Sequence, residues 1–373
     1  MESALFAPTQ TEDLVTNRAA SPAGSLSAPA LDASVVVEDG AVLILDRRVF
    51  PARIEWVRAA TPAEVATAIT DMVTQSSGPM FAACAGMELA ALQAASLSLD
   101  AAAASLHTAG HALANARPTN NHPCEAVEHI LAAIVGTTST PQLVELAIEA
   151  AREFAQLYRT RSRALGEYTV ALLDDGARIL THCWMDTYLV ELVRAADAAG
   201  KRFDWVATET RPYLQGARLT SHTLREMGQR VTLITDSMGA AALAPGSTLG
   251  RIDALVTAAD RVSLDGSVAN KVGTLGLAVA AQAFEVPYYA LVQAPDATLA
   301  TGSDIVIEQR DPDEVFSTLG ARTASELVTD AWYPAFDVTP PRFVTAVVTD
   351  RGPFAPAALR DYFADAPAAA TAS

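Results

Sequence analysis

The stretch RILTHCWMDTYLVELVRAADAAGKRFDWVAT, residues 178–208, decides the fold. Its two ends, Arg178–His182 and Phe203–Thr208, are short apolar runs typical of buried strands, and the segment between them is predicted to be a helix. A strand, a helix and a second strand in this order predict a βαβ unit with parallel strands. We therefore predict an α/β fold with a Rossmann-like domain over residues 167–373, built on a mostly parallel sheet. The further predicted strands are Arg230–Thr235, Ala254–Thr257, Pro287–Val292 and Phe343–Thr349.

The N-terminal part of the chain has a different character. Residues 1–33 are rich in Ser, Ala, Pro and Thr without sustained periodicity, which predicts a disordered tail. Asp39-Gly40 separates two apolar runs and is a hairpin signal, because the turn needs positive φ angles at both positions. From Pro62 to about Leu165 the sequence predicts helices. We therefore expect a small β element and a helical N-terminal domain over residues 34–166.

The composition argues against several classes of protein. The chain has 26 Lys and Arg residues against 43 Asp and Glu residues, and its net charge of −17 matches a phosphodiester backbone poorly. No apolar run reaches the roughly 18–20 residues that span a bilayer. The first residues lack the basic and apolar regions of a secretory signal. We expect a cytoplasmic protein that binds neither nucleic acid nor a membrane.

The cysteines predict neither a disulfide framework nor a zinc site. Cys84, Cys124 and Cys183 are an odd number and lack C-x-x-C spacing. No Walker motif is present and no G-x-G-x-x-G follows the first predicted strand, so a nucleotide cofactor is not indicated. We therefore predict no metal and no cofactor, and a cysteine that has a function would act as a thiol.

Polar residues follow four of the five predicted strands in the βαβ region. Cys183 follows the first strand, Glu209 the second, Asp236 the third and Asp260 the fourth. In an open parallel sheet, ligands bind at the carboxyl ends of the strands, where the strand order changes direction. One interpretation is that each polar residue only caps the next helix. The other is that the thiol and Asp260 face one crevice as an acid–base pair, with the pKa of the thiol raised by apolar neighbours such as Trp184.

Two segments are predicted to be loops that enter helices, Gln215–Arg218 and Gly266–Gly273. A helix N-terminus presents unpaired N–H groups and the positive end of the helix dipole, which suits a phosphate. Lysine occurs only twice in the chain, and Lys271 stands next to Asn270 in the second segment. We therefore expect Lys271 to contact a ligand.

Taken in order, these segments resemble the family of methylthioribose-1-phosphate isomerases and the related regulatory subunits of translation initiation factor 2B. The resemblance covers residues 35–356 approximately. The matching motifs are ARPT at 116–119, ILTHC at 179–183, TETRPYLQGARLT at 208–220, LITD at 233–236, ADR at 259–261, VANKVGT at 268–274 and PAFDVTP at 334–340.

The resemblance implies an aldose–ketose isomerase acting on a 5-substituted ribose 1-phosphate, such as methylthioribose 1-phosphate. In the isomerase branch the cysteine of THC and the aspartate of ADR are the proposed catalytic pair, which corresponds to Cys183 and Asp260 here. The family also implies a homodimer and a small sugar phosphate as the ligand. The resemblance implies that Arg117, Gln215, Asn270 and Lys271 hold the sugar phosphate. We also expect Gly216, Glu209 and Trp184 to belong to the substrate-binding site.

The chain departs from the family pattern at two loops. The isomerases carry an Arg-Gly-Ala-Pro loop whose arginine meets the substrate phosphate, whereas Gln75–Met80 contains no arginine. The bulky stretch Trp184–Tyr188 replaces a small polar stretch after the catalytic cysteine. His122, in a third divergent segment, is either a substrate contact or a loop histidine without a second function.

These departures leave the substrate open. Ribose 1,5-bisphosphate is an alternative substrate, and a non-catalytic sugar-phosphate or nucleotide sensor of the initiation-factor type is an alternative function. A scaffold that only dimerises is a third hypothesis, which an apolar strip along the helices would support. The sequence also leaves open whether isomerisation proceeds through an enediol or a hydride shift.

Overall fold

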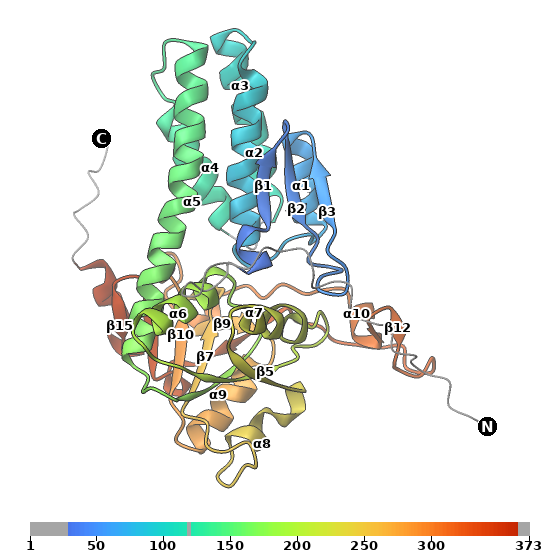
Figure 1. Cartoon of the computed structure of the whole chain (residues 1–373), viewed down its shortest axis with the longest axis vertical. Helices are drawn as coiled ribbons and strands as arrows, with labels where there is room; N and C mark the ends of the chain where they lie inside the picture. The colour runs from blue at the N-terminus through green and yellow to red at the C-terminus, as the bar shows by residue number, and fades with distance from the viewer. Residues whose placement is uncertain (1–28, 118–120, 365–373) are drawn as a thin grey trace.

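The computed structural model describes residues 29–117 and 121–364. A helical part stands above a sheet part, and the long helix α5 (Thr140–Ala171) reaches from one to the other (Figure 1). Residues 1–28 of the predicted tail lie outside the described residues. The end of that predicted tail is ordered, because Ala30–Ala33 form a 3₁₀ turn in which Leu31 is buried.

The predicted hairpin is confirmed and is part of a three-stranded antiparallel sheet. Its strands are β1 (Val35–Glu38), β2 (Ala41–Leu45) and β3 (Trp56–Ala59). Asp39 and Gly40 have φ angles of 48° and 69°, as a two-residue turn with the twist of a hairpin requires. The sheet covers helices α1 and α2 on one side of the helical part.

The predicted helices are confirmed, and local signals explain where they begin. Thr61 and Glu64 form a capping box at the start of α1, and the side chain of Ser139 accepts a hydrogen bond from Gln142 N at the start of α5. The helix α2 is buried on nearly all faces because other helices surround it. The helices before α5 are α1 (Pro62–Thr70), α2 (Gly78–Ala94), α3 (Leu99–Asn115) and α4 (His122–Ala133).

The main sheet has seven strands in the order β15-β14-β10-β7-β4-β5-β6, and all except β15 are parallel. The chain enters at β4, moves outward to β6, and returns to the other side of β4 with β7. The strand order therefore changes direction between β4 and β7, which is where an open α/β sheet binds ligands. The strands are β4 (Arg178–Thr181), β5 (Asp204–Thr208), β6 (Arg230–Ile234), β7 (Ala254–Ala258), β10 (Tyr288–Leu291), β14 (Ala346–Thr349) and β15 (Gly352–Phe354).

Short helices connect these strands. The helix α6 packs closely against α5, because a Cβ atom on Gly166 would lie only 2.8 Å from the backbone of Glu191. The helix α5 crosses residue 166, where the sequence predicts a domain boundary. The connecting helices are α6 (Thr187–Ala198), the π-helical turn Gly216–Thr220, α7 (Ser221–Glu226), α8 (Gly239–Leu243) and α9 (Thr274–Ala283).

Three sequence predictions are wrong in detail. Most of the predicted loop Gln215–Arg218 belongs to the π-helical turn Gly216–Thr220. Within the predicted loop Gly266–Gly273, residues Val268–Lys271 form strand β9, which pairs with β8 (Arg261–Val262) and β13 (Phe336–Thr339) in a small antiparallel sheet. The strand predicted to begin at Phe343 begins at Ala346, because Pro341–Phe343 form a 3₁₀ turn. A projecting segment carries α10 (Asp313–Phe316) and the hairpin of β11 (Ser317–Thr318) and β12 (Ala321–Arg322).

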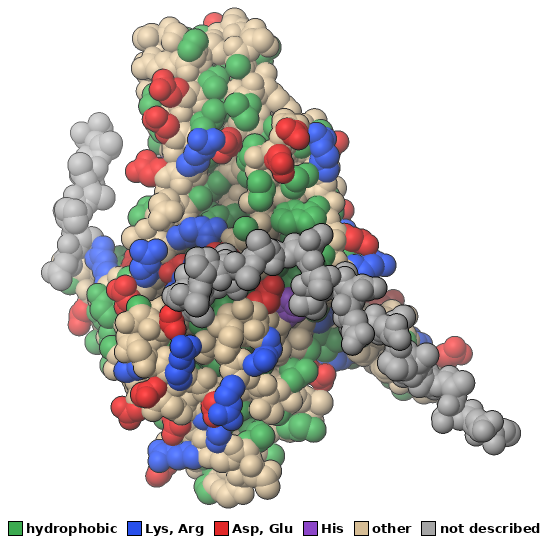
Figure 2. Space-filling view, in the orientation of Figure 1, with side chains coloured by type: hydrophobic (Ala, Val, Ile, Leu, Met, Phe, Trp, Pro, Cys, Tyr) green, Lys and Arg blue, Asp and Glu red, His purple; other side chains and the backbone are tan. Residues whose placement is uncertain are grey.

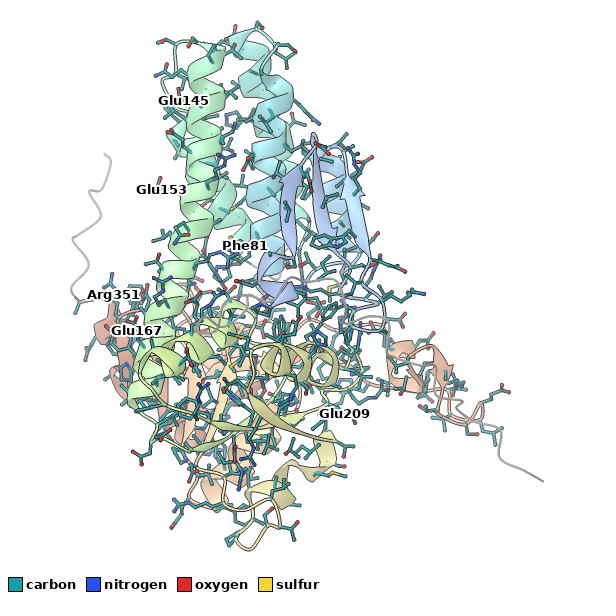
Figure 3. The ribbon with its side chains drawn as sticks, viewed as in Figure 1. Phe81, Glu145, Glu153, Glu167, Glu209 and Arg351 are labelled. Atoms are coloured by element: carbon teal, nitrogen blue, oxygen red, sulfur yellow. The ribbon has the colours of Figure 1, made fainter. Side chains whose placement is uncertain are left out.

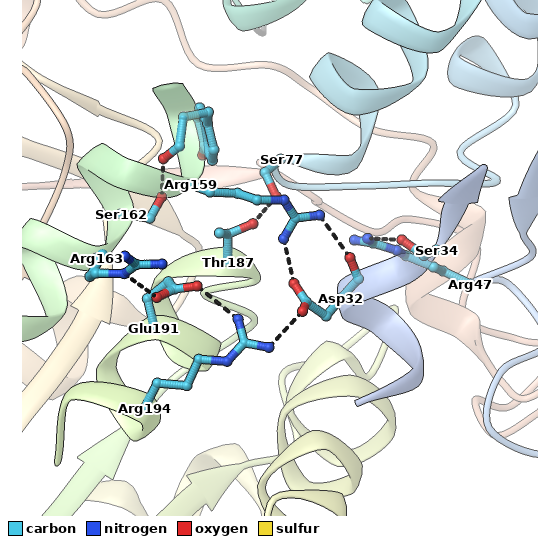
Figure 4. A network of polar contacts seen from close by, with 11 residues as sticks. Asp32, Ser34, Arg47, Ser77, Arg159, Ser162, Arg163, Thr187, Glu191 and Arg194 are labelled. Carbon is cyan, nitrogen blue, oxygen red and sulfur yellow. Dashed lines mark hydrogen bonds and ion pairs between the residues drawn. The ribbon is translucent and has the colours of Figure 1, made fainter. Parts of the chain in front are cut away.

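Ion pairs and a shared core join the two parts (Figure 4). Asp32 accepts hydrogen bonds from Arg159 of α5 at 2.5 Å and from Arg194 of α6 at 2.8 Å. Burial raises the pKa of the Asp32 carboxyl, but these two guanidinium groups outweigh it and lower that pKa. The ordered end of the predicted tail is therefore fixed to both parts.

The surface is mixed in charge. On the face in Figure 2, acidic and basic side chains are interspersed, and hydrophobic side chains gather over the helical part. Among the described residues, no helix is both long and apolar enough to cross a membrane.

Candidate active site

A cavity of about 500 Å³ lies between the helical part and the carboxyl ends of β4, β7 and β10. Its wall is formed by the loop before α2, the segment after α3, side chains of α5, the segments after β4, β7 and β10, and strand β9. This position coincides with the change of strand order between β4 and β7. The predicted site residues that line the cavity are Arg117, Cys183, Trp184, Gln215, Asp260, Asn270 and Lys271.

Cys183 stands at the end of β4 with a φ of 68°, in the left-handed region. Its backbone N–H donates to Thr210 Oγ1 at 2.9 Å, and its carbonyl accepts a hydrogen bond from Thr220 Oγ1. Burial raises the pKa of the thiol to about 12, Lys271 acts in the opposite direction, and Asp260 adds to the increase. The thiol is therefore protonated at neutral pH, and its pKa is shifted in the direction that the apolar neighbours predict.

Asp260 follows β7, and its backbone N–H donates to Ala269 O of β9 at 2.9 Å. Asp260 is solvent-accessible because it lines the cavity, but the surrounding protein keeps its carboxyl away from bulk water. This burial raises the pKa of its carboxyl, Lys271 and Arg117 lower it, and Glu308 raises it. Cys183 and Asp260 line the same cavity, and the negative charge of Asp260 contributes to the raised pKa of the thiol.

The cavity contains a cationic region suited to an anion. Lys271 is almost fully buried, with its Nζ 4.5 Å from the centre of the Phe336 ring. Burial lowers the pKa of the Arg117 guanidinium, and the negative charges of Glu308 and Asp260 act in the opposite direction. Asn270 is buried, and its Nδ2 donates to Thr274 Oγ1 at 3.0 Å. These side chains come from β9 and from the segment after α3, not from a helix N-terminus.

Two predicted substrate-binding residues are outside the lining of the cavity. A Cβ atom on Gly216 would lie 1.7 Å from Thr208 O, so this glycine allows the π-helical turn to pack against β5. Glu209, labelled in Figure 3 on the sheet part, is half-buried, and its backbone N–H donates to Ile234 O at 2.8 Å. Asp236 also lies outside, where it accepts hydrogen bonds from Thr210 N and Arg211 N. The Asp236 carboxylate therefore holds the turn after β5 and neither caps the next helix nor faces the cavity.

Gln75, in the loop that lacks the family's arginine, lines the cavity and is buried. Gln215 Nε2 donates to Gln75 Oε1 at 3.4 Å. Within the part of the chain that the structure describes, Gln75 Nε2, Gln215 Oε1 and Trp184 Nε1 have no hydrogen-bond partner. Unsatisfied buried polar atoms beside a cavity are groups that a polar ligand can satisfy.

Several lining residues gave no sequence signal. Tyr158 and Arg161 come from the middle of the long helix α5, where a charged or aromatic side chain is ordinary. Gln293 follows β10, and its Nε2 donates to Tyr158 O at 2.9 Å. His122, predicted to be either a substrate contact or a loop histidine without a second function, lines the cavity. Its Nδ1 lies 3.2 Å from Glu125 Oε2. Residues 118–120, including part of the ARPT motif, lie outside the described residues.

The fold and the site define a class: an α/β protein with a helical N-terminal part and a polar cavity, lined by Lys271 and Arg117, at the switch point of a parallel sheet. Among the described residues, no group of three or more His, Cys, Asp or Glu side chains is arranged to hold a metal ion. The chain belongs to the Initiation factor 2 subunit family, whose model matches residues 75–356.

Relatives agree with this assignment. The methylthioribose-1-phosphate isomerase of Pelotomaculum thermopropionicum is 37% identical and aligns with 84% of this chain and 88% of its own. The 5-deoxyribose 1-phosphate isomerase of Moorella thermoacetica is 35% identical over 85% of this chain and 93% of its own.

Solved structures of the same fold carry two kinds of name. The 5-methylthioribose 1-phosphate isomerase of Pyrococcus horikoshii has a TM-score of 0.80 and 29% identity, covering 90% of this chain and 97% of that one. The delta subunit of initiation factor eIF-2B from A. fulgidus has a TM-score of 0.77 and 32% identity, covering 87% of this chain and 96% of that one. The predicted fold class and family are confirmed.

Proposed function

We propose that this protein is an aldose–ketose isomerase that converts a 5-substituted ribose 1-phosphate to the corresponding ribulose 1-phosphate. The observation that carries the proposal is the meeting of Cys183 and Asp260, from neighbouring strands at the switch point, in one cavity with the cations Lys271 and Arg117. The names of the relatives support the reaction class.

The reaction needs groups that handle protons at two places. Phosphate on the anomeric oxygen prevents spontaneous opening of the sugar ring, so the C1–O4 bond must break with protonation of the ring oxygen. One hydrogen moves from C2 to C1, and the hydroxyl proton on O2 is lost as the ketone forms. We assign protonation of the ring oxygen to Asp260, whose pKa is raised by burial so that its protonated form is more populated. We place Cys183 on the C2 side of the sugar. In an enediol route, the carboxylate that Asp260 becomes after protonating the ring oxygen takes the proton of the thiol, and the thiolate then takes the C2 proton, returns it to C1 and accepts the O2 proton, which restores both groups. In a hydride shift, the C2 hydrogen passes directly to C1 with its electron pair, and the Asp260 carboxylate accepts the O2 proton.

The phosphate group is assigned to the cationic region. Arg117 and Lys271 supply charge, and the buried amides of Asn270 and Gln215 supply neutral contacts. Trp184 lines the cavity directly after the catalytic cysteine, and its bulk limits the space beside the sugar. The large side chain favours a small or flat substituent on C5.

The test is turnover by the purified protein. Methylthioribose 1-phosphate, 5-deoxyribose 1-phosphate and ribose 1,5-bisphosphate are incubated separately, and ketose formation is followed by NMR. We expect turnover with at least one 5-substituted ribose 1-phosphate, and its loss in Cys183→Ser and in Asp260→Asn with unchanged melting temperatures. Full activity in both variants would refute the catalytic assignment, and preference for the bisphosphate would change the substrate.

A second candidate is a non-catalytic sugar-phosphate or nucleotide sensor. The observations that favour it are the uncharged Gln75 in the cavity loop and the structural likeness to an initiation-factor subunit. Calorimetry would detect it as micromolar or tighter binding of ribose 1-phosphate or a nucleotide without any ketose product.

We also propose that the protein acts in the cytoplasm as a homodimer. The charged substrate, which does not cross membranes unaided, supports the location. Exposed apolar side chains on the projecting segment, including Leu319, Leu327 and Trp332, support a partner surface. Light scattering of the purified protein measures the mass directly, and a monomer at micromolar concentration would refute the dimer.

A further inference from the structure

The buried ion pair between Arg47 and Asp186 connects two loops that line the cavity, although neither Arg47 nor Asp186 lines it. Arg47, two residues after β2, is 1% exposed, and its Nη1 donates to Asp186 Oδ2 at 2.8 Å. Asp186 is 4% exposed and stands three residues after Cys183. Placing both charges away from water is costly, so a pair at this depth calls for an explanation beyond stability.

The same two side chains hold the loop before α2. Arg47 Nη1 also donates to Gln75 O at 2.7 Å, and Asp186 Oδ2 accepts a hydrogen bond from Ser77 N at 3.2 Å. Ser77 Oγ lies 3.1 Å from Thr187 Oγ1, the next residue along from Asp186 (Figure 4). The loop residues Gln75 to Ser77 are thus fixed by contacts at both ends.

Asp186 adopts an unusual conformation to make these contacts. Its φ of 50° and ψ of −125° lie in a region that residues with a side chain rarely occupy. It immediately precedes α6, where Asp is a favoured cap, but its carboxylate makes no capping hydrogen bond to that helix. The carboxylate serves the loop before α2 instead.

We propose that the Arg47–Asp186 ion pair is a positioning device for the site: it holds the segment Cys183–Asp186 and the loop Gln75–Ser77 in the geometry that the reaction needs. Neither Arg47 nor Asp186 lines the cavity, so both act through other residues. This inference rests on the proposed function, since it assigns Cys183 a reactive role. A displacement of about 1 Å at a reacting group can lower turnover about 100-fold.

The first experiment compares two ion pairs that both join the helical and sheet parts. Asp186→Asn breaks the pair beside the catalytic loop, and Asp32→Asn weakens the pairs with Arg159 and Arg194, which line no part of the cavity. We expect Asp186→Asn to lower kcat 10- to 100-fold with less than a threefold change in KM, measured well below its melting temperature. We expect Asp32→Asn to lower the melting temperature with kcat within twofold. Normal kcat in Asp186→Asn would overturn the proposal.

The double variant Arg47→Met/Asp186→Gly separates position from stability and guards against misfolding of the single variant. It leaves no unpaired buried charge, and glycine accepts the backbone conformation of residue 186. Because Gln75 O and Ser77 N lose their side-chain partners, we expect a melting temperature below that of the original protein but above that of Asp186→Asn, which leaves Arg47 unpaired, together with a kcat at least 10-fold lower. A stable double variant with full kcat would show that the pair is structural only.

A third measurement does not depend on isomerase activity. The rate at which iodoacetamide alkylates Cys183, followed by peptide mass spectrometry, reports the position of the thiol. We expect at least a 10-fold change in Asp186→Asn and less than a twofold change in Asp32→Asn. If the original protein turns over no sugar phosphate, the proposed function fails while this comparison still decides the positioning role; equal rates in the original protein and Asp186→Asn would refute it.

Discussion

We predict that the raised pKa of Asp337, next to the cationic region, makes the free energy of unfolding depend on pH. It lies opposite Asn270 in the β9–β13 pairing, and its carboxylate accepts hydrogen bonds from Gly273 N at 2.7 Å and Leu275 N at 3.1 Å. Burial raises the pKa of this carboxyl from 3.8 to about 6, although both N–H groups and Lys271 lower it. A carboxyl with a raised pKa stabilises the fold at low pH, and this contribution is lost as the pH rises through about 6.

The magnitude follows from the shift. About 2 pKa units correspond to about 3 kcal/mol of unfolding free energy between very low and neutral pH. Between pH 5 and 8, a range above the isoelectric point of about 4.7, the expected loss is about 1.4 kcal/mol. This loss of unfolding free energy comes from titration of Asp337, so a variant without the carboxyl should not show it.

The assay is urea unfolding of the original protein and of Asp337→Asn at pH 5, 6, 7 and 8. Subtracting the two unfolding free energies removes the contributions of all other groups that titrate in both proteins. We expect the original protein to lose about 1 to 1.5 kcal/mol relative to the variant across this range. A constant difference, or one that grows in favour of the original protein as the pH rises, would refute the electrostatic reasoning.

Substitutions at three other sites, one of them with a matched control, test separate features. Gly216→Ala places a Cβ atom against Thr208 O, so urea unfolding should show a loss of about 3 kcal/mol or more, whereas Gly276→Ala, in open space on α9, should be neutral or slightly stabilising. Lys271→Met removes a buried cation from the cavity, and calorimetry should show at least 10-fold weaker binding of ribose 1-phosphate; unchanged affinity would place the phosphate elsewhere. Lys201→Met removes two hydrogen bonds to carbonyls at the end of α5 and should cost about 1–2 kcal/mol without changing kcat.

The sequence predicts the elements whose signals are local. Asp39-Gly40 specifies its hairpin by backbone conformation alone, and the apolar runs of β4 to β7 alternate with helices over short distances. Because the carboxyl ends of parallel strands share one edge, the convergence of Cys183 and Asp260 on a single cavity also follows from their positions after two strands.

The rest depends on partners that are distant in the sequence. Lys271 belongs to β9 because Phe336 pairs with it, and nothing near Lys271 indicates that strand. Arg47 and Asp186 are 139 residues apart, so their ion pair cannot be inferred from either neighbourhood. Glu209 follows a strand as Cys183 does, yet lies outside the cavity, because β5 is one strand farther from the switch point.

The length of α5 couples distant ends of the molecule mechanically. Its 32 residues form one unbroken rod of about 48 Å, with Tyr158 and Arg161 in the cavity wall and Thr140 at the far end (Figure 1). Thr140 lies about 27 Å from Tyr158 along the helix axis, so a tilt of about 2° about Tyr158 would displace the far end by about 1 Å. The tip of this helix is therefore a natural place for a spectroscopic label that senses whether the cavity is filled.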